Sequence, residues 1–317
     1  MRVAIVGAGA IGGFIAAALA KAGVPVALVA RGEHLAAIAR DGLRIDSDLG
    51  RFTARVDAAD ELDKLGSFDA LLLTFKSHHW PQLVGQLKPF AGTAATIVTL
   101  QNGLPFWYVR EPPLQSVDPR GSIGRLFSDD RIVGGVVHVS GRIVAPGHVR
   151  QSGGLRYVLG PPNGGRSERA QELVDLLRQA GLRAELDSNI RATVWLKLVN
   201  NAGLNSVSVL RQSTIKQMLA DPGARAQVRG LMIEALHVGQ AMKAVAEVDV
   251  DARIDYAARL DDVKTSTLQD YERRRQLELD PILGAVIELA QRYGVEVPQV
   301  RTAYASLKEA ASREVLR

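Results

Sequence analysis

Near the N-terminus, residues 3–12 read Val3-Ala4-Ile5-Val6-Gly7-Ala8-Gly9-Ala10-Ile11-Gly12. The first four residues are all apolar, which predicts a short strand buried on both faces. A glycine-rich turn follows, and the alanine-rich segment 11–22, which ends at Gly23, predicts a helix. The next apolar run, 26–29, predicts a second strand. Strand, helix and strand within about thirty residues indicate a βαβ unit and a parallel sheet.

The turn after the first strand carries the pattern G-x-G-x-x-G. Gly7 permits a tight turn, Gly9 lets the backbone approach a pyrophosphate, and Gly12 lets the helix press against the strand. The helix N-terminus then offers free N–H groups to phosphate. This context predicts a dinucleotide site made by Gly7, Ala8, Gly9, Ala10, Ile11 and Gly12. The alternative is a small-residue contact between helix and strand without a ligand.

The end of the second strand indicates which dinucleotide binds. A site for NAD usually carries Asp or Glu here, whereas this strand ends in Ala30-Arg31-Gly32. An arginine suits the 2′-phosphate of NADP, so we expect NADP, bound as NADPH. Glu33 lies two residues on, and a solvated loop charge is the other interpretation of Arg31.

The alternation of strands and helices continues through the first part of the chain. Further elements are expected at 70–74, 81–87, 96–100, 132–139, 143–145, 148–150, 157–159, 167–180 and 183–186, all strands except the helices 81–87 and 167–180. Beyond Asp187 helical periodicity takes over, at about 189–210, 222–247, 251–262, 281–293 and 298–315. We therefore expect two domains, 1–187 and 188–317. Asp221-Pro222 and Asp280-Pro281 each predict an N-cap, and 106–130 predicts an irregular surface insertion.

Polar residues follow two of the expected strands. Lys76 comes shortly after the strand 70–74, and Asn102 shortly after the strand 96–100. Ligands of open parallel sheets bind at the carboxyl ends of the strands. Lys76 is therefore a candidate for phosphate or substrate charge, and Asn102 for a contact with both cofactor and substrate. Ordinary loop polarity is an equally good interpretation of each residue.

The first helix of the second part carries three polar residues on an otherwise apolar surface. Lys197, Asn201 and Asn205 are spaced i, i+4 and i+8, and each step turns about 40° beyond a full circle, so they share one side. Buried polar groups need partners. A lysine ammonium near a substrate carbonyl both stabilises and protonates the developing oxyanion. The alternative is a lysine in the core whose ammonium reaches solvent, together with asparagines that cap the helix.

Two later residues extend this candidate site. Ser266 is a candidate for binding a carboxylate, and Glu278 for pairing with Lys197 or with a substrate hydroxyl. Read alone, they are a helix-cap residue and a surface acid.

Composition excludes several other functions. The 317 residues carry a formal charge of +5 spread along the chain, apart from Arg273-Arg274-Arg275, which gives no support for nucleic acid binding. The absence of cysteine excludes disulfides and thiolate chemistry. The six histidines lack metal-ligand spacing and no G-x-S-x-G is present, so neither a metal site nor that hydrolase chemistry is expected. No membrane segment is predicted, and we expect a cytoplasmic protein.

Taken together, these residues resemble the ketopantoate reductase (2-dehydropantoate 2-reductase) family over nearly the whole chain. The resemblance rests on the glycine motif with Arg31, Lys76, Gln101-Asn102-Gly103, the Lys197–Asn205 helix, and Ser266 twelve residues before Glu278. It implies a Rossmann-type α/β domain joined to an all-α domain, as in 6-phosphogluconate dehydrogenase, with the active site in the cleft between them. A homodimer is one assembly it allows.

The resemblance also implies roles. The family reduces 2-dehydropantoate, a small 2-oxo acid, to pantoate with NADPH, for pantothenate and coenzyme A synthesis. Lys197 matches the proton donor, and Glu278 lies by cofactor and substrate. Asn102 touches both ligands. Asn201, Asn205 and Ser266 hold the substrate.

The sequence departs from the family on the substrate side. Members often read Glu-Ile-Asp-Tyr-Ile-Asn-Gly where this chain has Glu278-Leu279-Asp280-Pro281-Ile282-Leu283-Gly284, and a further substrate asparagine is Ile215 here. The insertion after Gly103 is another difference. A paralogue acting on another branched 2-oxo or hydroxy acid, or on an opine-like substrate, therefore stays open. A nucleotide-sensing protein without turnover is the rival from another class.

Overall fold

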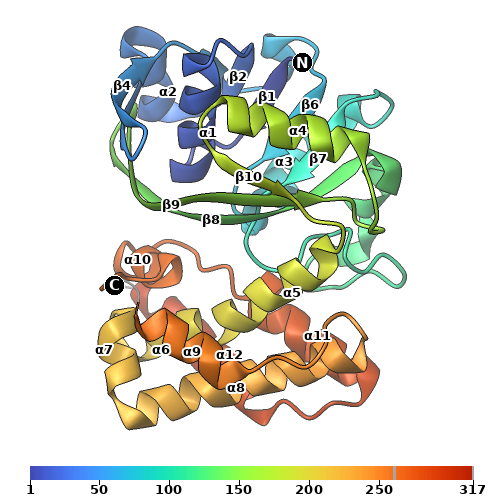
Figure 1. The fold of residues 1–317 in the computed structure, drawn as a ribbon, viewed down its shortest axis with the longest axis vertical. Coiled ribbons are helices and arrows are strands. Elements are labelled where there is room, and N and C mark those ends of the chain that lie inside the picture. The colour runs from blue at the N-terminus through green and yellow to red at the C-terminus, as the bar shows by residue number, and fades with distance from the viewer. Residues whose placement is uncertain (260–261, 316–317) are drawn as a thin grey trace. The chain divides into compact units, whose positions relative to one another are not determined.

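The computed structural model describes residues 1–259 and 262–315, and the chain forms two compact units. The first comprises Met1–Gln101 and Ser122–Ile190, and the second Asn102–Gly121 and Arg191–Arg317. The first holds every strand and the second is helical (Figure 1). The predicted α/β Rossmann-type and all-α fold classes are confirmed. The chain passes between the units near residues 101, 121 and 190, rather than once.

The first unit is built on a ten-stranded mixed sheet. Its order is β4-β3-β9-β8-β7-β6-β1-β2-β5, with β10 paired to β9. The strands are β1 (Val3–Val6), β2 (Val26–Val29), β3 (Leu43–Ser47), β4 (Gly50–Ala54), β5 (Asp57–Ala59), β6 (Ala70–Leu73), β7 (Thr96–Thr99), β8 (Ile132–Ala145), β9 (His148–Gly160) and β10 (Arg183–Leu186). Strands β5, β2, β1, β6, β7 and β8 run parallel. The chain order reverses between β1 and β6, so the turns after these two strands lie at a topological switch point.

Four short strands were expected between 132 and 159, but the structure has two long ones. Strands β8 and β9 form one antiparallel hairpin, and β10 joins it in parallel. The glycines that suggested breaks are accommodated by register shifts at His138/Ser140, Ser140/Gly141 and Ile143/Ala145. A β-bulge of this kind inserts a residue without ending the strand. Strands β3, β4 and β5 were not predicted.

Helices cover the sheet and complete the core. Helix α1 (Ala10–Lys21) contacts β1 to β4, β8 and β9, and α4 (Glu168–Gln179) packs beside it on β9 and β10 (Figure 1). The smaller helices of this unit are α2 (Gly32–Asp41), α3 (Trp80–Leu87) and the 3-10 turns η1 (Asp63–Leu65), η2 (Ser77–His79), η3 (Lys88–Phe90), η5 (Gly124–Leu126) and η6 (Asp129–Arg131). The alanine-rich surface of α1 is buried almost throughout, which explains its composition.

In the second unit, helix α8 (Pro222–Ala241) is central and contacts most of the others. The other elements are the 3-10 turn η4 (Pro119–Gly121), α5 (Ile190–Asn200), the π-helix η7 (Asn201–Asn205), α6 (Ser206–Arg211), α7 (Ile215–Ala220), α9 (Val250–Ala258), α10 (Ser266–Glu272), the π-helix η8 (Asp280–Gly284), α11 (Ala285–Tyr293) and α12 (Pro298–Val315). Trp195 is fully buried and donates to the carbonyl of Ala235 on α8, at 3.1 Å. The expected helix 251–262 is confirmed to residue 258, and its positions 260–261 lie outside the described residues.

Two sequence-based expectations about this unit were wrong. The segment 106–130 was expected on the surface, but Phe106, Trp107 and Tyr108 are buried, and Tyr108 donates to the carbonyl of Arg191 at 3.0 Å. Asp221 caps α8 as expected, through a 2.6 Å bond from Ala224 N. Asp280 does not cap a helix, because it lies inside η8 and accepts hydrogen bonds from Tyr304 and Lys308 instead.

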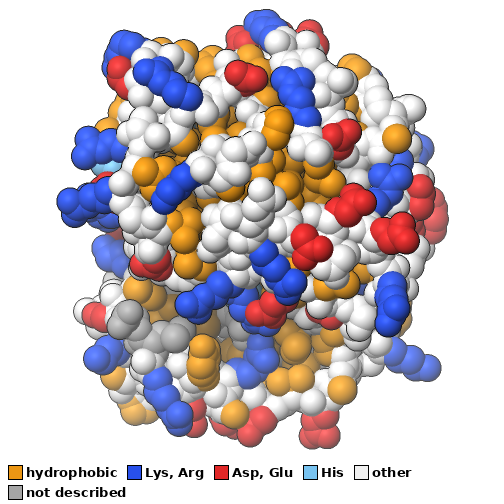
Figure 2. Space-filling view, turned by 45° about the horizontal axis from the view of Figure 1, so that its top comes forward, with side chains coloured by type: hydrophobic (Ala, Val, Ile, Leu, Met, Phe, Trp, Pro, Cys, Tyr) orange, Lys and Arg blue, Asp and Glu red, His pale blue; other side chains and the backbone are white. Residues whose placement is uncertain are grey.

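The surface agrees with the scattered charge of the sequence. On the face drawn in Figure 2, basic and acidic side chains are interspersed. Within the described residues no helix is both long enough and apolar enough to span a bilayer.

Candidate active site

The glycine-rich turn after β1 is held in a shape that larger residues would not permit. Gly7 has φ +112°, and a Cβ there would lie 2.8 Å from the backbone nitrogen of Phe75. A Cβ on Gly12 would lie 2.1 Å from the carbonyl oxygen of Gly7 and 2.3 Å from Oγ1 of Thr74. The turn therefore packs directly on the strand behind it and on the end of β6.

The same turn leaves room on its other side. A Cβ on Gly9 would meet nothing within 4 Å. Gly9 is the N-cap of α1 and offers no side chain to the first N–H groups of that helix. Open space beside unsatisfied N–H groups at the positive end of a helix fits a pyrophosphate. These residues therefore suit the dinucleotide that the motif predicts.

Thr74, which the sequence analysis did not single out, holds this turn, and His34, also not singled out, lies beside it. Thr74 Oγ1 donates to the carbonyl of Gly7 at 2.8 Å. His34 Nδ1 accepts from Gly147 N at 2.9 Å, while burial lowers the pKa of His34 and the Ala8 carbonyl opposes that shift. The position of Thr74 at the end of a predicted strand was the one signal for it. Nothing in the sequence links residue 34 with residue 147.

Basic side chains gather at the ends of β2 and β6. Arg31 precedes α2 in an extended conformation and donates to Oε1 of Gln82, on the first turn of α3, at 3.4 Å. Lys76 lies at the start of η2. Both cations act on the imidazole of His79, whose pKa they lower together with burial. The structure thus brings Arg31 and Lys76 into one electropositive group.

In the second unit, the predicted catalytic helix is not a regular α-helix. Lys197 lies on α5, and the backbone then widens into the π-helix η7, which begins at Asn201 and ends at Asn205. Four residues overshoot an α turn but fall short of a turn bonded from i to i+5. The step from 201 to 205 therefore turns by slightly less than a full circle, which offsets the drift of about 40° expected for the step from 197 to 201.

Close packing from α8 holds the π-helix η7. A Cβ on Gly203 would lie 2.6 Å from Cγ of Met232 and 2.9 Å from the carbonyl oxygen of Val228. The second π-helix, η8, and helix α10 both contact η7. Short π segments are uncommon and occur often at functional sites.

Lys197, Glu278 and Asn102 come together beside these π-helices. Burial lowers the pKa of Lys197 to about 8, and the Glu278 carboxylate opposes that shift. Asn102 Nδ2 donates to Oε2 of Glu278 at 3.4 Å. The adjoining chain is fixed by a 2.7 Å bond from Leu104 N to the carbonyl of Pro281 in η8. An ammonium, a carboxylate and an amide thus lie close together, and groups of these kinds can donate a proton and orient a substrate.

The remaining predicted substrate residues lie on elements that contact η7 or belong to it. Asn201 and Asn205 are partly buried, and their side chains bond to none of the described residues. Ser266 is the exposed first residue of α10, whose N-cap is Thr265. These amide and hydroxyl groups are available to a ligand.

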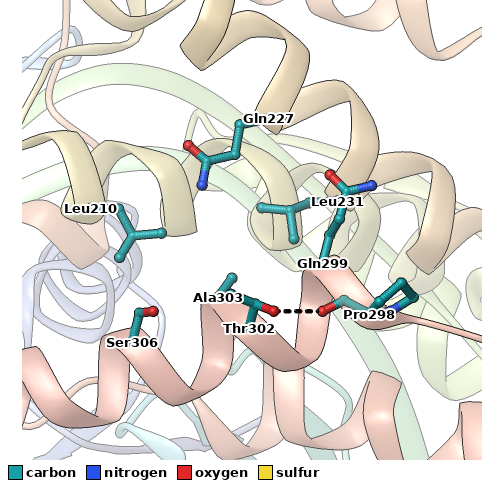
Figure 3. A pocket seen from close by; sticks show the side chains of 8 residues that line it. All are labelled: Leu210, Gln227, Leu231, Pro298, Gln299, Thr302, Ala303 and Ser306. Carbon is teal, nitrogen blue, oxygen red and sulfur yellow. Dashed lines mark hydrogen bonds between the residues drawn. The ribbon is translucent and has the colours of Figure 1, made fainter.

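A cavity of about 240 Å³ lies elsewhere in the helical unit (Figure 3). Helices α6, α8 and α12 line it with Leu210, Gln227, Leu231, Pro298, Gln299, Thr302, Ala303 and Ser306. Thr302 turns its hydroxyl to the carbonyl of Pro298, at 2.9 Å. The lining has no charged side chain and none of the predicted site residues, so it offers no charge to balance a carboxylate or a phosphate.

Comparison with known proteins agrees with this geometry. The family described as "Ketopantoate reductase PanE/ApbA" matches residues 3–164, and its C-terminal model matches residues 189–311. A 2-dehydropantoate 2-reductase of Mesorhizobium japonicum is 38% identical over 319 residues, covering 98% of each chain. The chain belongs to the ketopantoate reductase family. The resemblance stated from the residues is thereby confirmed.

Solved structures of the ketopantoate reductase family share the fold. The 2-dehydropantoate 2-reductase of Geobacter metallireducens is 29% identical, with a TM-score of 0.88 over 98% of this chain and 100% of that one. D-mandelate dehydrogenase, solved with NADH and anilino(oxo)acetate, has a TM-score of 0.87 at 21% identity, covering 99% of each chain. That second likeness concerns the fold alone.

Proposed function

We propose that this protein is an oxidoreductase that reduces 2-dehydropantoate to pantoate with NADPH, the step that serves pantothenate and coenzyme A synthesis. The observation that carries the proposal is the placement of Lys197 beside Glu278, with its pKa lowered to about 8, in a member of the ketopantoate reductase family. A lysine of this kind gives up its proton near neutral pH, as a general acid must.

In this proposal the first unit binds the cofactor. The backbone of Gly7, Ala8, Gly9, Ala10, Ile11 and Gly12 takes the pyrophosphate, and Arg31 and Lys76 take the 2′-phosphate. Asn102 and Glu278 stay predicted contacts of the cofactor. NADPH supplies a hydride when bound. The cationic pair Arg31 and Lys76, with no carboxylate at the end of β2, supports NADPH over NADH.

Lys197 supplies the proton in the proposed reaction. As C2 of the 2-oxo acid is reduced, its carbonyl oxygen gains negative charge, and the Lys197 ammonium donates a proton to it. The product is a 2-hydroxy acid, and the neutral amine regains a proton from solvent. The Glu278 carboxylate favours the protonated amine between turnovers and orients Asn102, to which it is bonded.

Asn201, Asn205 and Ser266 hold the substrate, with Asn102. The amides provide donors and acceptors for a hydroxyl and a carboxylate, and the Ser266 hydroxyl provides one more donor. The two asparagines support this role because their side chains have no partner among the described residues.

The decisive experiment is a panel of 2-oxo acids, 2-dehydropantoate among them, with NADPH oxidation followed by absorbance. We expect turnover with 2-dehydropantoate and a loss of about 10²- to 10⁴-fold in kcat for Lys197→Ala, the usual contribution of a general acid. NADPH binding should be unchanged in that variant. Unchanged turnover would remove Lys197 from the mechanism, and NADPH binding without turnover on any acid would favour a nucleotide sensor.

A second candidate substrate is another branched 2-oxo acid. The observation that favours it is the replacement of family residues around η8 and at Ile215, both on the substrate side. The same panel distinguishes the candidates, because activity confined to other acids would replace 2-dehydropantoate and leave the chemistry intact.

The proposal extends to a homodimer. It is supported by a ketopantoate reductase of Staphylococcus aureus described as dimeric, which shares the fold at 21% identity. Light scattering of the purified protein should give about twice the mass of 34.1 kDa.

A further inference from the structure

An arginine of the helical unit lies beside the proposed catalytic helix. Arg253 is in the first turn of α9, and its Nε donates to Oδ1 of Asn200 at 3.1 Å. Asn200 is the last residue of α5, immediately before η7. It lies three positions after Lys197, and residues three apart share one side of a helix. The bond therefore holds the Arg253 guanidinium against the end of α5, close to the side that carries Lys197.

The guanidinium of Arg253 is half-buried and has no acidic partner among the described residues. Burial lowers the pKa of Arg253, and no carboxylate in the described part of the chain offsets that shift. Within residues 1–259 and 262–315 its Nη groups accept no partner, and neither is among the polar atoms buried without one, so both are open to solvent. Two arginines of α8 differ, because Arg225 and Arg229 pair with Asp255 and Asp251 of α9. Arg253 is thus a fixed cation with most of its donors unused.

The proposed site has no positive charge for the carboxylate of its substrate. In the proposed reaction the Lys197 ammonium serves the carbonyl oxygen, whereas Asn201, Asn205 and Ser266 are neutral. A carboxylate that leaves water needs a charged partner or several hydrogen bonds. A guanidinium is planar and permanently charged and can offer two parallel N–H groups to a carboxylate. In a 2-oxo acid the carboxylate is bonded to the carbonyl carbon, so its partner has to lie near Lys197.

We propose that Arg253 is a further substrate-binding residue, whose Nη groups bind the carboxylate of the 2-oxo acid while Asn200 holds its Nε. The inference rests on the proposed function, because it assumes a 2-oxo acid at Lys197. The charge of this carboxylate does not change as the neighbouring carbonyl is reduced. Arg253 therefore binds the ground state and the transition state equally, and its contribution appears in KM rather than in kcat.

The experiment compares the unmodified protein with Arg253→Met, using the most active 2-oxo acid of the panel and the methyl ester of that acid. We expect KM for the acid to rise by about 10- to 100-fold in the variant, the usual contribution of a hydrogen bond to a charged group, with kcat nearly unchanged. The ester presents the same carbonyl without the charge. Its KM, or its inhibition constant where it is not turned over, should be equal in both proteins.

Two further variants separate charge, geometry and folding. Arg253→Lys keeps the positive charge but loses the planar pair of donors, so its KM for the acid should lie between those of the unmodified protein and Arg253→Met. Arg229→Met is the matched control, because it makes the same change in an arginine that is paired with Asp251 between α8 and α9. It should leave KM for the acid unchanged.

Asn200 tests how the guanidinium is held. Asn200→Ala removes the acceptor for Nε and should raise KM for the acid by about three- to tenfold, the value of one ordinary hydrogen bond. In the Arg253→Met background the same change should have no further effect, because the group that Asn200 positions is then missing.

Two outcomes would overturn the inference, and a third its basis. An unchanged KM for the acid in Arg253→Met would remove this side chain from the substrate site and leave the proposed reaction intact. Equal increases for acid and ester would show that the substitution disturbs packing instead of carboxylate binding. Absence of turnover by the unmodified protein with every 2-oxo acid would refute the proposed function itself.

Discussion

In the proposed mechanism, the side chain of Lys197 has to meet two requirements that usually conflict. A stabiliser of negative charge has to be protonated, whereas a proton donor has to release its proton easily. Burial lowers the pKa of Lys197 to about 8, and Glu278 limits that shift. At neutral pH the ammonium form therefore still predominates, and its proton costs much less to remove than that of an exposed lysine.

The pH dependence of turnover should follow this group. The reduction requires protonated Lys197, so kcat/KM for the 2-oxo acid should fall about tenfold per pH unit above pH 8. Oxidation of the 2-hydroxy acid requires the neutral amine, so its kcat/KM should rise as pH passes through the same value. Initial rates in both directions between pH 6 and 10 check this.

Lys197→Arg is the matched control for the pH profile. Arginine keeps the positive charge but does not release its proton in this range. Its residual rate should therefore show no inflection near pH 8. An inflection that persists there in the variant would assign the titration to another group.

At the level of elements, the two contacting π-helices set the site apart from the rest of the helical unit. The first, η7, carries Asn201 and Asn205, and the second, η8, begins two residues after Glu278. Each widens a helix where a side chain of the proposed site has to be placed. Gly203 is what allows η7 to approach α8 so closely.

Gly203→Ala should therefore damage both stability and turnover. The added methyl would lie 2.9 Å from a backbone oxygen, which cannot move as a flexible side chain can. Overpacking of this kind lowers the free energy of unfolding by about 1–3 kcal/mol. Thermal unfolding measures the loss, and kcat for the 2-oxo acid should fall with it.

The control for this substitution is Gly85→Ala in α3. A Cβ at Gly85 would meet nothing within 4 Å. Replacing glycine inside a helix then favours the folded state by about 0.5–1 kcal/mol. Equal effects of the two substitutions would show that the packing of η7 is unimportant.

Local patterns predicted the elements that depend on local sequence. The β1–α1–β2 unit, the cap at Asp221 and the helical second part all follow from apolar periodicity and capping residues. The β8–β9 hairpin was misjudged because pairing between strands tolerates glycines that look like breaks. Asp280 was misjudged because Tyr304 and Lys308, far along the chain, compete for its carboxylate.

The candidate site was predicted to a similar extent. Spacing placed Lys197, Asn201 and Asn205 on one helix, but the π-helix leaves no pattern that periodicity detects. The bond between Asn102 and Glu278 joins residues 176 positions apart. Neither it nor the contact of His34 with Gly147 can be read from local sequence, because each depends on the complete fold.

For the whole molecule, the division into two units places most of the proposed cofactor residues in the first unit and the proposed catalytic and substrate residues in the second. Gly7 to Gly12, Arg31 and Lys76 belong to the first unit, whereas Lys197, Asn201 and Asn205 belong to the second. Binding of each ligand should therefore change hydrogen exchange mainly in its own unit.

Hydrogen exchange should detect the binding of NADPH to the first unit. NADPH at about one hundred times its Kd stabilises the folded form that binds it by about 2.7 kcal/mol. We expect slower exchange at the amides of residues 8–13 and around Arg31, with little change in α11 of the helical unit. Protection that begins in α11 and leaves residues 8–13 unchanged would contradict the assignment of the cofactor to the first unit.

The threefold passage of the chain between the units has a consequence for cleavage. A protease that nicks the backbone at 190/191 would produce two fragments, but the N-terminal fragment still contains residues 102–121, whose partners are in the other piece. Tyr108 remains bonded to the Arg191 carbonyl and packed near the Trp195 ring, and Glu288 keeps its bonds to Ser116. The fragments should therefore stay associated without a covalent link, and separately expressed halves should reconstitute the fold only when the N-terminal half retains those twenty residues.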